Sequence, residues 1–184
     1  MSSSLTAAPS DVQGSDARFN TIPSLDGAPP LVTVRHLTKT YCGRPALRDL
    51  SLSLPAGRIV GLMGANGCGK TTLLKILAGV LADYEGQVRI AGHAPGPLSK
   101  ALVSFLPDAD FLATSLTPPR AIAQFSRLFA DFDAAKARRL VDFFALPAER
   151  SIKEMSKGMG EKLRIALMMS RRARVYLLDE PISG

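Results

Sequence analysis

The sequence predicts an α/β domain, and three segments carry that prediction. The short apolar run Arg58–Met63 is typical of a buried strand, and a glycine-rich loop separates it from apolar residues at helical spacing in Thr71–Leu81. A second apolar strand, Val175–Leu178, ends in two acidic residues. Helical periodicity fills much of the interval between these strands, so we expect a sheet combined with helices.

Apolar alternation and short apolar runs predict the other strands. In chain order these strands span residues 31–35, 50–54, 86–92 and 102–106. Further helices are predicted to start at Thr117-Pro118 and to span residues 133–144 and 159–170. Residues 1–30 are rich in Ser, Ala, Pro, Asp and Gly and show no sustained period, so we predict a disordered tail there and a folded domain over residues 31–184.

The composition is that of a folded chain outside the membrane. With 184 residues, 46% hydrophobic and 21% charged, the chain can bury a core. No segment approaches the roughly 18 uninterrupted apolar residues that a membrane-spanning helix needs. Residues 1–10 lack the basic and apolar parts of a secretory signal. Cys42 and Cys68 form neither a disulfide framework nor a metal-ligand spacing, which indicates the cytoplasm.

Basic residues are in excess, with 23 Lys and Arg against 16 Asp and Glu and a net charge of +7. The excess is concentrated in residues 134–174. A basic patch can serve nucleic acid, acidic lipid or a phosphate ligand, and it can equally be a solvated helix face beside an anionic ligand. The charge alone leaves these interpretations open.

The segment Gly64–Thr71, Gly-Ala-Asn-Gly-Cys-Gly-Lys-Thr, matches the phosphate-loop pattern G-x-x-x-x-G-K-[ST] at every required position. It lies between a predicted strand and a predicted helix, as that motif requires. Glycines let backbone N–H groups surround phosphate oxygens, and the helix N-terminus adds a favourable dipole. Lys70 then reaches the outer phosphates and the Thr71 hydroxyl ligates Mg²⁺. The segment therefore predicts binding of a nucleoside triphosphate with Mg²⁺.

The acidic end of the last predicted strand supplies a second part of such a site. A carboxylate at the end of a buried strand beside the loop can hold Mg²⁺, which is the role predicted for Asp179. Glu180 is placed where it could orient and polarise the attacking water. Two adjacent acids at a solvated strand end are the alternative.

Together, four segments in this order resemble the ATP-binding cassette (ABC) ATPases. They are Tyr41, the phosphate loop continued through Thr72, the signature-like Met155–Met159, and Leu177–Pro181. The resemblance covers about residues 31–184. It implies a P-loop NTPase core sheet with an N-terminal antiparallel β region and a helical subdomain at about residues 112–158.

The resemblance also implies roles for individual residues. Tyr41 would stack on adenine, and Ser156 with the Gly158 amide would contact the γ-phosphate of ATP on a second cassette, across a head-to-tail dimer. The catalytic residues implied are Lys70 and Glu180, and the Mg²⁺ ligands are Thr71, Asp179 and Asp108. The residues implied to bind ATP are Tyr41, Gly64, Ala65, Asn66, Gly67, Cys68, Gly69, Lys70, Thr71, Thr72, Asp108, Ser156 and Gly158.

Some positions depart from the family pattern. The signature-like segment is Met-Ser-Lys-Gly-Met instead of Leu-Ser-Gly-Gly-Gln, a form similar to that of the exporter subgroup. Asp108 follows Pro107 where the family has a glutamine loop. The family's switch histidine lies beyond the acidic strand, whereas His36 and His93 lie elsewhere. We therefore expect a C-terminally truncated domain whose sheet is incomplete. Four basic residues near the signature-like segment would face an approaching triphosphate, namely Lys153, Lys157, Lys162 and Arg164.

The resemblance implies an ATP-binding and ATP-hydrolysing subunit of an ABC transporter, an exporter in particular, on the cytoplasmic inner face of the membrane. Its partners would be separate membrane-spanning subunits and a second cassette. Two alternatives stay open. One is a non-catalytic nucleotide-binding or regulatory remnant, and the other is a soluble ABC protein acting on the ribosome or DNA.

Overall fold

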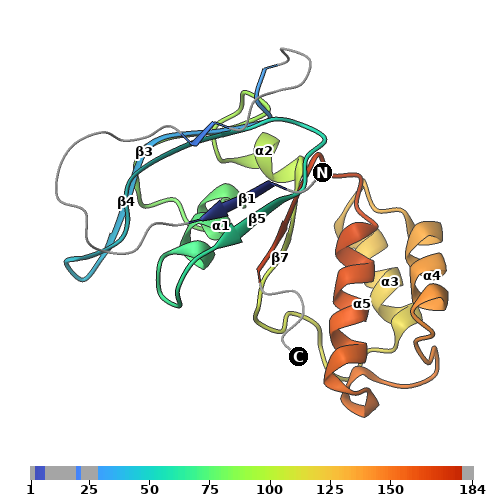
Figure 1. The fold of residues 1–184 in the computed structure, drawn as a ribbon. Coiled ribbons are helices and arrows are strands. Elements are labelled where there is room, and N and C mark those ends of the chain that lie inside the picture. The colour runs from blue at the N-terminus through green and yellow to red at the C-terminus, as the bar shows by residue number, and fades with distance from the viewer. Residues whose placement is uncertain (1–2, 7–19, 22–28, 180–184) are drawn as a thin grey trace. The chain divides into compact units, whose positions relative to one another are not determined.

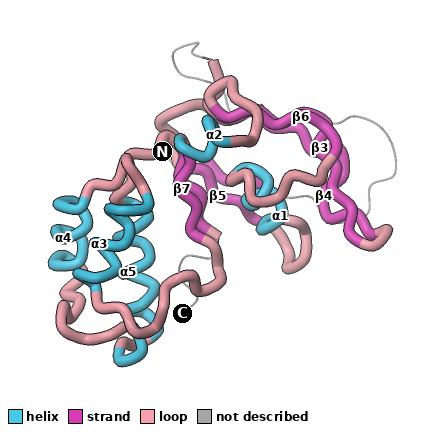
Figure 2. The backbone as a smooth tube through the Cα atoms, turned by 180° about the vertical axis from the view of Figure 1, so that it is seen from behind, coloured by secondary structure: helices cyan, strands magenta, loops and turns pink. Residues whose placement is uncertain are grey.

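The computed structural model describes residues 3–6, 20–21 and 29–179 and confirms the α/β class. The chain divides into two compact units, Met1–Ala101 and Leu102–Gly184, which we describe separately. Strands dominate the first unit, and helices α3, α4 and α5 belong to the second (Figures 1 and 2).

The first unit contains a four-stranded sheet in the order β2-β4-β3-β6. Its strands are β2 (Asn20–Thr21), β3 (Val32–Tyr41), β4 (Arg44–Leu54) and β6 (Glu85–Ile90). The long strands β3 and β4 form one antiparallel hairpin, so the predicted strands at 31–35 and 50–54 are its far ends. Cys42 and Gly43 make the two-residue turn, both with positive φ, as the twist of a hairpin favours. This sheet confirms the predicted antiparallel β region.

Strand β5 (Val60–Met63) precedes the phosphate loop and pairs in parallel with β1 (Ser3–Thr6). The prediction that the run 58–63 is buried on both faces is wrong, because Ile59 is 81% and Met63 54% exposed. Strands β1 and β2 also lie within residues 1–30, where we expect a disordered tail. Strand pairing uses backbone groups that every residue has, so a strand can form without the side-chain periodicity on which sequence prediction depends. The rest of that segment lies outside the described residues.

Helix α1 (Lys70–Leu77) is shorter than the predicted span of 71–81. Gly79 ends it, with a φ of 68°, in a Schellman motif where the N–H groups of Gly79 and Val80 donate to Ile76 and Lys75 carbonyls. The five-residue α2 (Pro97–Ala101) has too little periodicity for sequence reasoning to find it.

The second unit has two parallel strands, β7 (Val103–Leu106) and β8 (Val175–Leu178). Between them in sequence come α3 (Pro118–Leu128), α4 (Ala134–Phe143), the 3₁₀ turn η1 (Ile152–Glu154) and α5 (Lys157–Met169). The helices bury one shared apolar core, comprising Leu106, Ala121, Ile122, Phe125, Ala137, Val141, Leu146, Leu163, Leu167 and Met168. Helix α5 belongs to this core, so helical packing continues past residue 158. The limits of the helical subdomain stay a prediction.

Helices α3 and α4 of this unit start in different ways. Asp133 caps α4 by accepting a hydrogen bond from the backbone N–H of Lys136 at 2.8 Å. That bond, with the nearby charges of Arg172 and Arg139, holds the pKa of the Asp133 carboxyl below its usual range. Thr117 stands at the predicted start of α3, but its side chain makes no capping hydrogen bond, and Pro118 begins the helix.

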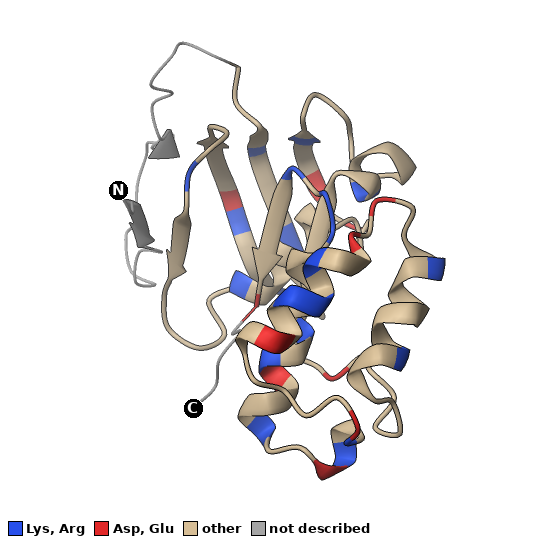
Figure 3. Cartoon of the chain, turned by 90° about the vertical axis from the view of Figure 1, so that its right-hand side faces the viewer, with Lys and Arg blue, Asp and Glu red and all other residues tan. Residues whose placement is uncertain are grey.

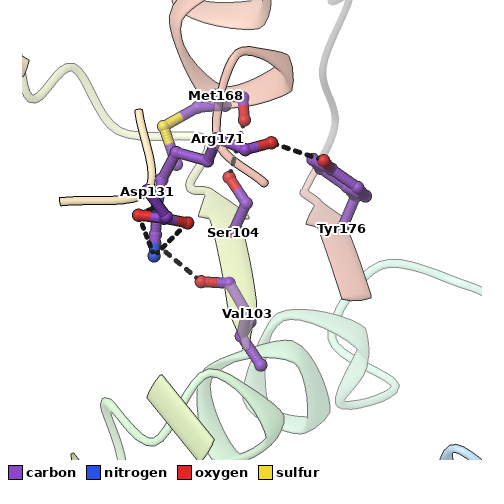
Figure 4. Close-up of polar contacts among 6 residues, drawn as sticks. All are labelled: Val103, Ser104, Asp131, Met168, Arg171 and Tyr176. Carbon is purple, nitrogen blue, oxygen red and sulfur yellow. Dashed lines mark hydrogen bonds and ion pairs between the residues drawn. The ribbon is translucent and has the colours of Figure 1, made fainter. Parts of the chain in front are cut away.

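A buried arginine just after α5 links this helix to the strands by hydrogen bonds (Figure 4). Arg171 is 6% exposed, forms two hydrogen bonds of 3.1 Å with the Asp131 carboxylate, and donates to the Val103 carbonyl at 2.8 Å. The Tyr176 hydroxyl donates to the Arg171 carbonyl at 2.6 Å. Helix α5 is therefore tied to both β7 and β8 by polar contacts inside the second unit.

Candidate nucleotide-binding site

The loop between β5 and α1 takes a backbone shape that glycine makes possible. Gly67 and Gly69 have φ values of 78° and 93°, in the left-handed region. A Cβ added to Gly69 would lie 2.3 Å from the Ala46 carbonyl oxygen and 2.8 Å from Cδ2 of Leu47. The loop is thus packed closely against β4 at the residue that caps α1.

Lys70 curls back over this loop. Its ammonium donates to the carbonyls of Gly64 at 2.8 Å and Ala65 at 3.0 Å, and it lies 3.9 Å from Sγ of Cys68. A cation is therefore held inside the loop at the N-terminus of α1, where the helix dipole also favours an anion. Phosphate oxygens can replace the two carbonyls as acceptors, so the residues present fit a triphosphate.

The first turn of α1 supplies the hydroxyl groups of the site. Thr71 is exposed and Thr72 is half-buried, whereas Leu73, Ile76 and Leu77 are buried and anchor the helix. Residues Gly64 to Gly67 are exposed. The helix thus holds its hydroxyl-bearing start open to a ligand while its apolar face fixes its position.

Tyr41 stands at the end of the β3–β4 hairpin and is 44% exposed. Its register partner is Arg44, two residues before Ala46, and Ala46 is the residue that approaches Gly69. The hairpin end that carries the aromatic ring is therefore connected through β4 to the phosphate loop.

In the second unit, β8 delivers Asp179. This residue is 3% exposed, and its backbone N–H donates to the Leu106 carbonyl at 2.9 Å. Leu106 and Leu178 are register partners in the parallel pair, so Asp179 and the segment that carries Asp108 leave the sheet at the same end. Asp108 is exposed. Glu180 lies outside the described residues.

The signature-like segment forms the start of α5. Ser156 is the N-cap, with its hydroxyl accepting a hydrogen bond from the Met159 N–H at 3.3 Å, and both Ser156 and Gly158 are exposed. This helix is 13 residues long, so its exposed start favours an anionic ligand. The serine therefore has a structural role in addition to the one that the family resemblance implies.

Arg164 is largely buried and paired, whereas we expect it from the sequence to face an approaching triphosphate. Its side chain is 14% exposed, pairs with Asp110 at 2.8 Å and donates to the Asp108 carbonyl at 3.4 Å. Helix α5 thereby holds the loop that follows β7. Sequence reasoning missed this contact because no motif links residues so far apart in the chain.

A family model described as ABC transporter matches residues 47–183. The chain belongs to the ABC transporter family.

Three relatives show the range of similarity. ABC transporter ATP-binding protein YtrB of Bacillus subtilis is 28% identical over 84% of this chain and 53% of its own length. Spermidine/putrescine import ATP-binding protein PotA of Legionella pneumophila is 34% identical over 84% of this chain and 44% of its own length. Aliphatic sulfonates import ATP-binding protein SsuB 1 of Xanthomonas axonopodis is 35% identical over 79% of this chain and 60% of its own length.

Solved structures show the same fold as this ABC domain. An ATP-binding subunit of an ABC transporter superposes with a TM-score of 0.72 and 25% identity, over 83% of this chain and 67% of that one. A putative ABC transporter ATP-binding protein from Pyrococcus furiosus superposes with the same TM-score of 0.72 at 22% identity, over 83% of this chain and 76% of that one. The predicted P-loop NTPase fold is thereby confirmed.

The chain spans about half the length of the curated relatives YtrB and PotA. Among the residues that the structure describes, no helix is both long and apolar enough to cross a membrane.

Proposed function

We propose that this chain is the ATP-binding and ATP-hydrolysing part of an ABC transporter. The observation that carries the proposal is the Lys70 ammonium held by the Gly64 and Ala65 carbonyls inside a left-handed glycine loop at the start of α1. Membership of the ABC family supports it, since this family binds and hydrolyses ATP.

ATP would place its phosphates in the loop and its adenine on Tyr41. The phosphate-binding residues are Gly64, Ala65, Asn66, Gly67, Cys68, Gly69, Lys70, Thr71 and Thr72. Backbone N–H groups of the loop and the Lys70 ammonium neutralise the charge that develops on the transferred phosphoryl group.

Mg²⁺ would be held by the Thr71 hydroxyl with the carboxylates of Asp179 and Asp108. Hydroxyl and carboxylate oxygens are suitable ligands for Mg²⁺, and an ion that is also bound to substrate phosphates needs only one or two protein carboxylates. When bound, the ion supplies positive charge beside the phosphates. Glu180 would accept a proton from the water that attacks the γ-phosphate.

A second cassette would complete each site. The exposed start of α5 offers Ser156 and the Gly158 amide to a γ-phosphate carried by a partner cassette. Each dimer would then contain two shared sites. Closing and opening of that dimer with ATP binding and hydrolysis would drive separate membrane-spanning subunits, and the chain would then lie on the cytoplasmic face of the membrane.

For the direction of transport we propose export, on the Met-Ser-Lys-Gly-Met form of the signature-like segment. Import is the second candidate, because PotA and SsuB 1 are named as import proteins. Reconstitution with its membrane subunits into vesicles tests this, since ATP added outside drives an exporter's substrate inward when the chain faces the outer solution. Loss of substrate from loaded vesicles instead would establish import.

Replacement of Lys70 by alanine tests the site. We expect Lys70→Ala to weaken Mg-ATP binding by roughly a hundredfold, because hydrogen bonds from a charged donor to the phosphates are lost. Isothermal titration calorimetry measures it. The matched control is Lys75→Ala, an exposed lysine later in the same helix, which should bind as the wild type does. Unaltered affinity in Lys70→Ala would overturn the site assignment.

Hydrolysis needs a separate measurement. Phosphate release by the wild-type chain should disappear in Glu180→Gln while Mg-ATP binding persists, because the amide orients water without accepting its proton. A wild-type chain that binds ATP but releases no phosphate would instead support the non-catalytic alternative.

A further inference from the structure

Lys39 is a buried lysine in the same strand as the tyrosine expected to bind adenine. Strand β3 places Lys39 and Tyr41 two residues apart, the spacing that puts side chains on one face of a strand. Lys39 is 5% exposed, whereas Tyr41 is 44% exposed. Burying an ammonium group costs free energy unless the group is paired, so we identify the groups that contact the Lys39 ammonium.

Two groups surround the Lys39 ammonium. One is the Asp83 carboxylate, with Nζ and Oδ2 2.7 Å apart. The other is the ring of Tyr41, whose centroid lies 4.8 Å from Nζ, within the range of a cation–π interaction. Asp83 itself is almost fully exposed and lies between α1 and β6, so the pair ties β3 to a second segment of the first unit. The ammonium is thus fixed at one point beside the ring.

This contact constrains the Tyr41 ring. A tyrosine at an exposed hairpin end can occupy several rotamers, and holding one of them when a ligand binds costs conformational entropy. The buried cation attracts the electron-rich face of the ring and favours one orientation before any ligand arrives. Lys39 occupies one face of the ring, and a flat ligand would have to stack on the part of the ring that stays exposed.

The ring is also connected to the phosphate loop. In the β3–β4 register Lys39 is the partner of Leu47, and Leu47 lies against Gly69. One short stretch of hairpin therefore carries the ammonium, the aromatic ring and the contact with the loop.

We propose that Lys39, held by Asp83, is a positioning residue that orients Tyr41 for stacking on the adenine base of ATP. The proposal rests on the function proposed above and deepens it. Lys39 acts on base recognition and leaves phosphate binding unchanged, because its ammonium is buried and directed to Tyr41 and Asp83.

The test compares ATP with inorganic tripolyphosphate, which has phosphates and no base. Isothermal titration calorimetry with each ligand and Mg²⁺ is carried out on the whole chain and on Lys39→Met, which keeps an unbranched apolar side chain and loses the charge. We expect ATP affinity to fall roughly three- to tenfold, the scale of a cation–π contact. Tripolyphosphate affinity should stay within about twofold of the wild type, since loop contacts are kept. An equal loss for both ligands, or no loss for ATP, would overturn the proposal.

Two further variants separate positioning from a general structural effect. Lys39→Arg keeps a cation for the ring and should restore most of the ATP affinity. The double variant Lys39→Met with Tyr41→Ala should bind ATP no more weakly than Tyr41→Ala alone, because Lys39 acts through the ring. Additive losses in the double variant, or failure of arginine to rescue, contradict the role.

Asp83→Asn covers the case in which Lys39→Met does not fold. It keeps the lysine but removes the charge that holds it, and we expect weaker ATP binding with unchanged tripolyphosphate binding. ATP affinity equal to the wild type would overturn the proposal. Failure of the proposed function looks different, because the folded wild-type chain then binds neither ligand.

Discussion

At the scale of single residues, the phosphate loop depends on one glycine more than on the others. Gly69 combines a φ of 93° with backbone contact against β4. Gly67 is also left-handed, but among the described residues a Cβ there would meet nothing within 4 Å. Gly67 is therefore needed for its backbone angle, and Gly69 for its angle and for space.

We expect Gly69→Ala to destabilise the chain by about 2 kcal/mol or more, since the left-handed backbone and the Ala46 carbonyl both oppose a methyl group. Chemical denaturation measures the change, and Mg-ATP affinity should fall with it. Gly160→Ala is the matched control, because Gly160 lies inside α5 with open space around it. It should be neutral or stabilising by up to about 1 kcal/mol. Equal effects of the two changes would show that Gly69 is not constrained.

At the scale of secondary-structure elements, the end of α1 and the start of α4 follow local rules, whereas the attachment of α5 does not. Helix α1 ends at Gly79 by a Schellman motif and α4 starts at Asp133 by an N-cap, both determined within a few residues. The attachment of α5 to the strands depends instead on Arg171, which reaches Asp131 and Val103 far away in sequence.

Replacement of Arg171 tests that attachment. We expect Arg171→Ala to lower the free energy of unfolding by about 3 kcal/mol, because it removes a buried guanidinium that bonds both the half-buried Asp131 carboxylate and the Val103 carbonyl. The adjacent Arg172 is a close control, since its side chain is 78% exposed and its pair with Asp133 is 3.9 Å long. Arg172→Ala should change stability by no more than about 0.5 kcal/mol. Urea unfolding of both variants gives the comparison, and a loss below 1 kcal/mol in Arg171→Ala would contradict the assigned role.

At the scale of the whole molecule, the net charge of +7 invites a comparison of two anionic partners. Figure 3 shows Lys and Arg in blue with Asp and Glu in red among them. Several cations of the second unit are already paired, Lys157 with Glu161, Arg164 with Asp110 and Arg171 with Asp131. The basic excess is therefore partly neutralised by the fold itself, which favours the phosphates of ATP over nucleic acid as its ligand.

We expect the chain to bind duplex DNA weakly at about 50 mM salt and to lose that binding by about 200 mM, as nonspecific phosphate contacts do. Mg-ATP binding should persist at the higher salt, because the loop contacts are specific. Fluorescence anisotropy of labelled DNA and calorimetry with ATP make the comparison. Tight DNA binding at about 200 mM salt would favour the alternative of a cassette that acts on ribosome or DNA.

Sequence reasoning predicted the site best where its geometry is local. The phosphate loop depends on neighbouring residues, and the spacing of its motif was enough to predict it. The N-cap position of Ser156 was not predicted, because the helix was expected to start at residue 159 and it starts at Lys157. The two-sided burial predicted for 58–63 is wrong, because an apolar run records preference for burial without recording what covers it. The strand Ser3–Thr6 escaped prediction because its pairing with β5 uses backbone groups that every residue has.

By itself the sequence determined the α/β class, the phosphate loop with Lys70, and the order of the motifs that show family membership. The tertiary structure alone decided which long-range partners the charged side chains find: Asp83 and the Tyr41 ring for Lys39, Asp110 for Arg164, and Asp131 for Arg171. The physical reason is distance along the chain. Turns and caps arise from backbone preferences over a few residues, whereas a buried charge takes its partner from whichever segment the packed core brings beside it.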